Sequence, residues 1–456
     1  MEEGFMKKKI ALLMAAVMAA ASLSGCGGSE KVTTEDTTAG SAADTTQAVT
    51  EGENGDVKLT MSWWGNQVRN EKTQAALDLY TGQNPGTEIE GQFSEWSDYW
   101  NKLATSAAGQ AIPDIVQMDY SFIDQYVKNG LLEDLTPYIK DGTLDVSNIS
   151  ENTMASGTVN GGVYAICAGI NAPSLLYNKT LLDKNGITVK DYMTTDEFID
   201  LCREVYQKTG YKTNIAYYNA GAYLDYFMRG SDVVLYGDKK MGGEEKDYLP
   251  FFQMYETGIK EGWFIDPGVF AELSIGSVEQ EPLVYGSSPE TMSWCAFYNS
   301  NQLTAMQKAA PEGMEIGITT WPSADPKKSG YLKSSQFFSV GAHSKNPEEA
   351  VKVINFLTNS SDANNILLGE RGVPASSVIA KELAPKMSDV DQKVIKFVNE
   401  VVTPNCSPIN PPQPDGASEV SNLLNQVQEQ LCYGVYDAKT AAEEFYNGAN
   451  SIMSKK

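Results

Sequence analysis

Aromatic side chains gather where several apolar segments of the sequence end, and polar side chains stand close to them. The stretch TMSWWGNQ, residues 60–67, places two tryptophans and an asparagine at one such end. A flat aromatic ring can stack on the apolar face of a sugar ring, while neighbouring polar groups hold its hydroxyls. The aromatic candidates for this work are Trp64, Tyr120, Tyr217, Tyr218 and Trp294, and the polar candidates are Asn66, Asp119, Asn171, Gln336 and Arg371.

The sequence offers no comparable group for covalent or metal chemistry. It has one histidine, His343, and lacks a glycine-rich phosphate loop, a GxSxG elbow and an HExxH zinc motif. A carboxylate pair for glycoside hydrolysis stays open, because Asp and Glu occur throughout. The cysteines show no metal-ligand spacing, and a Cys406–Cys432 disulfide stays open. We therefore expect no metal, no cofactor and no enzymatic activity.

The candidates must be positioned by alternating strands and helices. Alternation of apolar and polar residues predicts a strand over 57–64, with Trp63 in the core and Trp64 pointing the other way. A helix, a strand at 87–91, a helix from Trp96 and a strand at 113–119 follow, which is typical of a parallel α/β sheet. Ligands of such sheets bind beyond the carboxyl ends of the strands, where the aromatic candidates are expected.

The N-terminal segment predicts export and anchoring. Three lysines precede the apolar run Ile10–Ala21, which is shorter than the roughly 20 residues of a membrane span and typical of a signal peptide. The sequence LSGC, residues 23–26, resembles a bacterial lipoprotein box, so residues 1–25 would be removed and Cys26 would carry a lipid such as palmitate. Residues 26–55 lack aromatic residues and read as a disordered tether between the membrane surface and the body.

The charge of the chain argues against one class of partner. The formal net charge is −24 and no basic stripe occurs along the 456 residues. A protein that binds nucleic acid needs lysine and arginine to neutralise phosphates. We therefore expect no nucleic-acid partner, whereas a local basic pocket could still hold an anionic ligand.

Several stretches together resemble one protein family. In chain order they include LTMSWWGN (59–66), SDYWNKLATSAAGQAIPDIVQMD (97–119), GGVYAICAGINAPSLLYNK (161–179), ERGVPAS (370–376) and YDAKTAAEEFYNGAN (436–450). In this order, behind a lipoprotein signal, they resemble the family 1 extracellular solute-binding proteins of carbohydrate ABC importers. Maltose-binding protein belongs to the same group.

The resemblance implies an α/β protein with the two-lobed, type II periplasmic-binding-protein fold. Each lobe would be a mainly parallel sheet flanked by helices, with the ligand in the cleft between the lobes. Lobe 1 would comprise 57–166 and 322–369, and lobe 2 would comprise 170–318 and 374–456. The crossings between them would fall near 165–171, 319–323 and 369–374, where a hinge closes on the ligand.

The resemblance also implies a function. The protein would be the monomeric substrate-binding component of an ABC transporter, which captures a sugar or oligosaccharide and delivers it to membrane permease subunits. The binding positions that carry over are Trp64, Asn66, Glu95, Trp96, Asp119, Tyr120, Asn171, Tyr218, Trp263, Trp294, Tyr298, Gln336 and Arg371. One departure precedes Trp294, where Pro289 and Glu290 replace small residues. The alternatives are a binder of another solute, such as a polyamine or a metal chelate, and a surface glycoside hydrolase.

Overall fold

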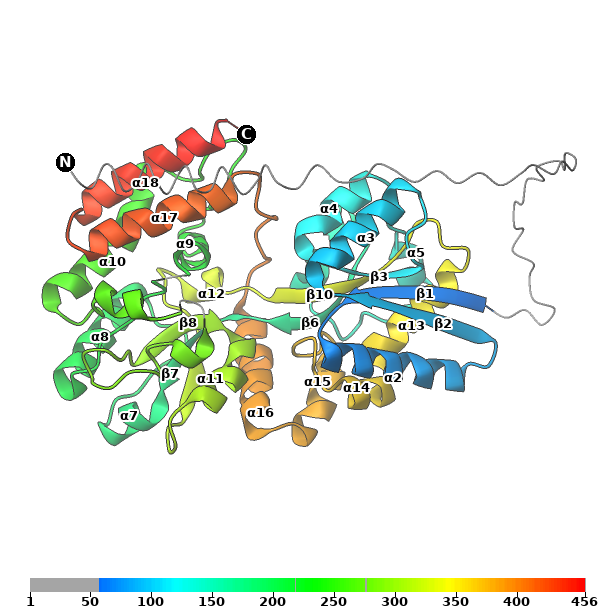
Figure 1. Ribbon diagram of the computed structural model, residues 1–456, viewed down its shortest axis with the longest axis horizontal. Helices are drawn as coiled ribbons and strands as arrows, with labels where there is room; N and C mark the ends of the chain where they lie inside the picture. The colour runs from blue at the N-terminus through cyan, green and yellow to red at the C-terminus, as the bar shows by residue number, and fades with distance from the viewer. Residues whose placement is uncertain (1–56, 218, 275–276, 456) are drawn as a thin grey trace, which may run out of the picture. The chain divides into compact units, whose positions relative to one another are not determined.

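The computed structural model describes residues 57–217, 219–274 and 277–455. These residues form two main sheets, each flanked by helices (Figure 1). The predicted α/β class is therefore confirmed. The predicted export signal, the tether, Cys26 and Tyr218 lie outside the described residues.

The first sheet has the strand order β2-β1-β3-β10-β6. Its strand β1 runs parallel to β2 and β3, while β10 runs antiparallel to β3 and β6. Helices α3 and α4 lie on one side of the sheet in Figure 1, and α2, α13 and α14 lie on the other. The strands are β1 (Val57–Trp64), β2 (Thr87–Ser94), β3 (Ile115–Met118), β6 (Ile166–Asn171) and β10 (Lys333–Val340). The helices packed with them are α2 (Gln67–Gln83), α3 (Trp96–Ala108), α4 (Tyr120–Lys128), α5 (Thr136–Lys140), α6 (Glu151–Ala155), α13 (Pro347–Asn359), α14 (Ser361–Leu367) and α15 (Ser377–Leu383).

Two polar residues mark the points where strands of this sheet give way to helices. Asn66 follows β1 in an extended conformation and caps α2, because its side-chain oxygen accepts a hydrogen bond from the Arg69 backbone N–H at 2.9 Å. Asp119 follows β3 and caps α4 in the same way, through the backbone N–H of Ser121 at 2.9 Å. Both residues thus stand at the carboxyl edge of the sheet because the helices begin there.

The second sheet differs from the mainly parallel sheet that was predicted. Its strand order is β8-β7-β9, and β7 runs antiparallel to both neighbours. Only Ala172 separates β7 from β6, so the direction of β7 is set by the passage between the two sheets. The strands are β7 (Pro173–Asn178), β8 (Cys295–Asn299) and β9 (Ile316–Thr319), and a separate hairpin is formed by β4 (Thr158–Val159) and β5 (Gly162–Val163).

The remaining helices belong mostly to the second half of the fold. In Figure 1, α9, α10, α17 and α18 gather on one side of the second sheet, and α7 and α11 lie on the other. Their bounds are α7 (Lys179–Lys184), α8 (Thr195–Thr209), α9 (Ala220–Arg229), α10 (Glu245–Glu261), α11 (Leu303–Ala309), α12 (Pro326–Ser329), α16 (Asp389–Lys396), α17 (Ala417–Cys432) and α18 (Ala438–Met453).

Buried apolar side chains form two clusters, and the second sheet contributes to both: Leu176, Ala296 and Ile316 pack in the first, and Leu175, Cys295 and Phe297 pack in the second. Ala380, Val394 and Val398 still pack in the first cluster, whereas Val420 and later buried residues pack in the second. Because the first cluster includes residues of both sheets, it does not assign residues 377–402 to either lobe. The lobe boundaries themselves stay a prediction.

The segment after α14 is held against β6 by a close approach of two backbones. Ile170 and Val373 exchange backbone hydrogen bonds of 2.7 and 3.1 Å. A Cβ atom added at Gly169 would lie 2.3 Å from the carbonyl oxygen of Arg371. This position therefore admits only glycine while the segment keeps its place.

We expect Gly169→Ala to lower the free energy of unfolding by about 1–3 kcal/mol, because backbone must move to admit the methyl group. Gly82→Ala in α2 is the matched control, since nothing lies within 4 Å of the added Cβ. That change should be neutral or stabilise the protein by about 0.5–1 kcal/mol, as expected for glycine in a helix. Urea denaturation of both variants measures the difference, and equal stabilities would contradict the prediction.

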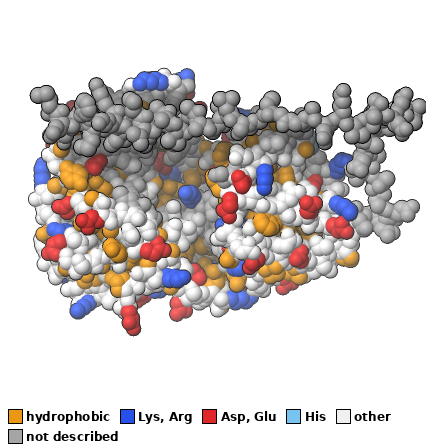
Figure 2. All heavy atoms as spheres, in the orientation of Figure 1, with side chains coloured by type: hydrophobic (Ala, Val, Ile, Leu, Met, Phe, Trp, Pro, Cys, Tyr) orange, Lys and Arg blue, Asp and Glu red, His pale blue; other side chains and the backbone are white. Residues whose placement is uncertain are grey.

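Acidic, basic and hydrophobic side chains are interspersed over both halves of the face shown in Figure 2. The net charge of −24 is therefore not concentrated in one patch on this face. Among the residues that the structure describes, no helix combines the length and the apolar character needed to cross a membrane.

Candidate ligand-binding site

An aromatic cluster lies at the carboxyl end of β1. Trp63 is fully buried, as predicted, and its indole N–H donates to Asn70 Oδ1 at 2.9 Å. The Trp64 ring lies 4.9 Å from that of Trp96 and 5.2 Å from that of Tyr99, in edge-to-face contacts. Trp64 is nearly buried, whereas Trp96 is 44% exposed. The ring that offers a surface to solvent is therefore Trp96, supported from behind by Trp64.

The polar residues near this cluster are only partly free to meet a ligand. The side-chain oxygens of Asn66 and Asp119 are used as helix caps, whereas Glu95 precedes α3 without a side-chain cap bond and is exposed. Tyr120, at the start of α4, donates its hydroxyl to the backbone carbonyl of Asn410 at 3.0 Å. Tyr120 thus joins the first sheet's carboxyl edge to the proline-rich segment 403–416.

A cavity of about 300 Å³ opens between the carboxyl edge of the first sheet and residues 369–374. Three predicted site residues line it: Asn171 from β6, Gln336 from β10 and Arg371. Each is at least nine-tenths buried. Asn171 Oδ1, Gln336 Oε1 and Arg371 Nη1 have no hydrogen-bond partner. Buried polar atoms are nearly always paired in folded proteins, so three unpaired atoms around one cavity indicate a binding site for a polar ligand.

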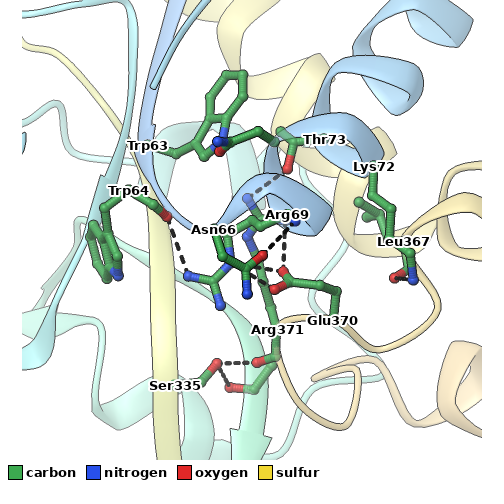
Figure 3. Close-up of polar contacts among 12 residues, drawn as sticks. Trp63, Trp64, Asn66, Arg69, Lys72, Thr73, Ser335, Leu367, Glu370 and Arg371 are labelled. Atoms are coloured by element: carbon green, nitrogen blue, oxygen red, sulfur yellow. Dashed lines mark hydrogen bonds and ion pairs between the residues drawn. The ribbon is translucent and has the colours of Figure 1, made fainter. Parts of the chain in front are cut away.

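A network of charged side chains fixes one wall of this cavity (Figure 3). Arg69 Nε donates to both carboxylate oxygens of Glu370, at 2.7 and 3.0 Å, and Arg69 Nη1 donates to the Trp64 carbonyl at 3.2 Å. Lys72 Nζ donates to the Leu367 carbonyl at 3.1 Å. The helix that begins beside Trp64 is thereby tied to the segment that carries Glu370 and Arg371.

Arg371 is the most constrained member of the network. Its Nε donates to Gln117 Oε1 at 3.1 Å and its Nη2 donates to Thr73 Oγ1 at 2.8 Å. The guanidinium group also lies 5.4 Å from the centre of the Phe338 ring. Burial, and to a lesser degree the positive charge of Arg69, lower the pKa of Arg371, and Glu370 opposes this shift. The structure therefore holds a buried positive charge whose Nη1 has no hydrogen-bond partner.

The structure separates the site residues predicted for the second half of the chain. Trp263 and Trp294 are packed in the second core, and their indole N–H groups donate to Glu261 and Thr213. No ring face of either is exposed, so both are left out of the candidate site. Tyr298 is nearly buried and donates its hydroxyl to Glu281 at 3.1 Å.

Two features of the site were missed from the sequence. The Arg69–Glu370 pair joins residues 301 positions apart, and no motif signals it. Gln117 lies fully buried inside β3, where it donates to the Trp64 carbonyl at 3.1 Å and accepts from Arg371. A glutamine within the apolar stretch PDIVQMD was a readable signal, because a buried amide needs partners.

The described residues contain no group of three or more His, Cys, Asp or Glu side chains arranged to hold a metal ion. Cys406 and Cys432, whose pairing was left open, are both free thiols. Burial raises the pKa of both thiols. Neither thiol is therefore poised as a reactive thiolate.

Two sheets flanked by helices, joined by repeated passages of the chain and with a polar cavity at one edge, define a protein that binds a small solute. The family model described as bacterial extracellular solute-binding protein matches residues 75–388. This match covers more than half of the chain, so the chain belongs to that family.

Solved structures share the fold over most of their length. A family 1 extracellular solute-binding protein from Alicyclobacillus acidocaldarius is 25% identical, with a TM-score of 0.79, over 88% of this chain and 100% of that one. A periplasmic oligogalacturonide-binding protein from Yersinia enterocolitica is 21% identical, with a TM-score of 0.71, over 88% and 99%. A protein of Brucella abortus named as a binding protein is 20% identical over 411 residues, 88% of this chain and 94% of the relative.

Proposed function

We propose that the protein is the substrate-binding component of an ABC transporter and that it captures a carbohydrate. The observation that carries the proposal is the cavity lined by Asn171, Gln336 and Arg371, whose side chains hold three unpaired polar atoms. Two of those atoms are amide oxygens and one is a guanidinium nitrogen. A ligand that both donates and accepts hydrogen bonds satisfies all three, and hydroxyl groups do both. The oligogalacturonide ligand named for the Yersinia protein supports the same reading.

The charged side chains of the cavity also bear on the alternative that the ligand is a polyamine. Arg69 and Arg371 both line the cavity. Glu370 and Asp391 line it as well, so the charged side chains of the lining sum to zero and supply no excess of acid to hold a polycation. A polyamine therefore gains no net attraction from the charges of this cavity, although the protein as a whole is acidic.

The remaining parts of the proposal follow from the chain outside the cavity. A lipid on Cys26 would hold the protein at the outer face of the cell membrane, and residues 26–55 would let the body reach the permease subunits. The two halves of the fold would close on the ligand by bending at the passages between the sheets, and the protein would act as a monomer. Closure excludes water and strengthens the polar contacts with the ligand.

Titration of the purified protein tests the proposal through its intrinsic tryptophan fluorescence. We expect a saturable change with one class of oligosaccharide, because Trp96 is exposed and the Trp64 carbonyl is bonded to Arg69 of the cavity lining, and we expect recovery of that oligosaccharide intact. Polyamines and metal chelates serve as the other arms of the panel, with calorimetry on each positive. Binding of a chelate or polyamine without any saccharide would overturn the carbohydrate assignment, and recovery of shortened saccharides would show a hydrolase.

A further inference from the structure

The second half of the fold contributes a wall of its own to the cavity. Asn301 and Thr304 line it from the short turn η3 (Ser300–Gln302) and from α11, and Asp391 lines it from α16. Thr304 Oγ1 donates to Asp391 Oδ1 at 2.7 Å, which ties α11 to α16. A ligand in the cavity therefore meets residues of both halves of the fold.

The charged side chains of the lining are engaged within the protein. Arg69 and Glu370 form an ion pair at 2.7 Å, and the two carboxylate oxygens of Asp391 accept hydrogen bonds from hydroxyl groups, each at 2.7 Å. Arg371 is held in the core through two of its nitrogens. The two positive and two negative charges also sum to zero. Recognition of a ligand therefore falls to neutral side chains.

Asn301 is the neutral polar side chain of this lining that is both exposed and unengaged. Asn171 and Gln336 are at least nine-tenths buried, whereas Asn301 is exposed. Ser335 and Thr304 already donate their hydroxyls to other groups of the protein. Within the part of the chain that the structure describes, the Asn301 amide takes part in no hydrogen bond. It therefore offers a ligand both a donor and an acceptor.

The backbone fixes the position of Asn301 relative to Asn171. Strands β7 and β8 pair antiparallel, and beyond the last pair of this ladder the Ser300 N–H donates to the Ala172 carbonyl at 2.8 Å. The Ala172 N–H in turn donates to Ser300 Oγ at 3.1 Å. Asn171, at the end of β6, and Asn301, just after β8, flank this pair of residues. Both amides thus reach the cavity from the passage between the two sheets.

We propose that Asn301 is a ligand-binding residue supplied by the second half of the fold, and that its amide hydrogen-bonds two adjacent hydroxyl groups of the saccharide. This inference rests on the proposed function, because it adds a specificity-determining residue to the same site. An amide presents a donor and an acceptor side by side, and each hydroxyl of a sugar can accept or donate. The hydrogen bonds between Ala172 and Ser300 hold this turn in place before the ligand arrives, so binding requires little ordering of the backbone.

Calorimetry on the purified protein tests this role with maltose, cellobiose, galactobiose, mannobiose and digalacturonic acid. Asn301→Leu keeps a branched side chain but removes the donor and the acceptor, and Asn301→Ala removes the side chain beyond Cβ. We expect both variants to bind the tightest of these disaccharides about 5- to 30-fold more weakly, as the loss of one or two neutral hydrogen bonds predicts. Gln302→Leu is the matched control, because Gln302 is an amide in the same turn but does not line the cavity. Its affinity should stay within about twofold of that of the natural protein.

Monodeoxy derivatives of the same disaccharide show whether the contact is direct. In the natural protein, removal of a hydroxyl that Asn301 binds should weaken binding several-fold. In Asn301→Leu the same removal should change the affinity by less than about twofold, because the partner of that hydroxyl is already gone. A purely structural role for Asn301 would leave the deoxy effects the same in both proteins.

The outcomes separate the two proposals. Affinities of both Asn301 variants within twofold of the natural protein, or equal deoxy effects in the natural protein and Asn301→Leu, would overturn the role of Asn301 and leave the carbohydrate function standing. Binding of no saccharide by the natural protein would overturn the carbohydrate function and this inference with it. Because Asn301 is exposed, thermal melting of its variants should match that of Gln302→Leu, and a clearly lower melting temperature would indicate a structural role instead.

Discussion

Replacing Arg229 by methionine is expected to lower the free energy of unfolding by about 3–5 kcal/mol. Arg229 ends α9, is almost fully buried, and donates to the carbonyls of Ser329 and Pro408, each at 2.9 Å. Its Nη1 donates to Asn410 Oδ1 at 2.7 Å. Methionine keeps the length of the side chain but leaves these acceptors without a partner. The segment 403–416 would then lose its main attachment to α9.

Asp225 adds to the expected loss. It lies one helical turn before Arg229 and accepts from Asn410 Nδ2 at 2.8 Å. Burial raises the pKa of Asp225, while Asn410 and Arg229 lower it, so without Arg229 the carboxyl would be still harder to ionise. A raised folded pKa stabilises the folded state at low pH, and this contribution is lost as the pH rises through that pKa. The deficit of Arg229→Met should therefore be larger at pH 7 than at low pH.

Urea denaturation measures this deficit, and Lys328→Met is the matched control. The Lys328–Asp232 ion pair is exposed, at 43% and 74%, and pairs of this kind contribute about 0–1 kcal/mol. A loss for Arg229→Met as small as that of the control would mean that the segment 403–416 is held by its other contacts. The double variant Arg229→Met/Asp225→Asn should recover part of the loss, because it removes a buried carboxylate that no longer has a positive charge beside it.

The sequence alone predicted the features that depend on residues close together in the chain. Alternation along β1 separated Trp63, which is core, from Trp64, which faces the other way, and the structure confirms that Trp63 is buried. Asn66 and Asp119 were predicted at strand ends, and they occur there because both cap the next helix. These features depend on neighbours within a few residues, so a single sequence contains the information that sets them.

The tryptophans of the second half show where the same reasoning fails. Trp263 was predicted as a site residue, but its ring packs on Gly258, where an added Cβ would lie 2.6 Å from it. Trp294 directly precedes the buried strand β8 and anchors its N–H on Thr213. Whether a tryptophan ring is buried or exposed depends on residues from other helices and strands. The spacing of residues along the chain gives no information about those contacts.

The cavity itself was beyond prediction for a related reason. Asn171, Gln336 and Arg371 were singled out as polar residues beside apolar segments, and the structure brings all three to one cavity. The partner that compensates the positive charge, Glu370, is bound by Arg69 across 301 residues. Residue types near strand ends thus indicated where a polar site would form. The ion pairing around that site depends on long-range contacts, which the sequence does not show.

Replacing Trp96 by alanine is expected to weaken carbohydrate binding about tenfold, which is about 1.4 kcal/mol, with little loss of stability. Trp96 is the exposed ring of the aromatic cluster at β1, and its contacts with Trp64 and Trp100 are edge-to-face. Removing a ring that is 44% exposed costs less core packing than removing a buried one. The loss should therefore fall on the surface offered to the sugar.

The saccharide identified by the fluorescence panel would be titrated calorimetrically into Trp96→Ala and into Tyr433→Ala. Tyr433 is the matched control, because it is 54% exposed and follows α17, which packs on the second core. Trp96→Phe should retain part of the affinity, since a smaller ring still stacks on a sugar face. If Trp96→Ala binds within twofold of the natural protein while both variants unfold normally, the sugar does not stack on this ring. Recognition would then rest on the polar cavity lined by Asn171, Gln336 and Arg371.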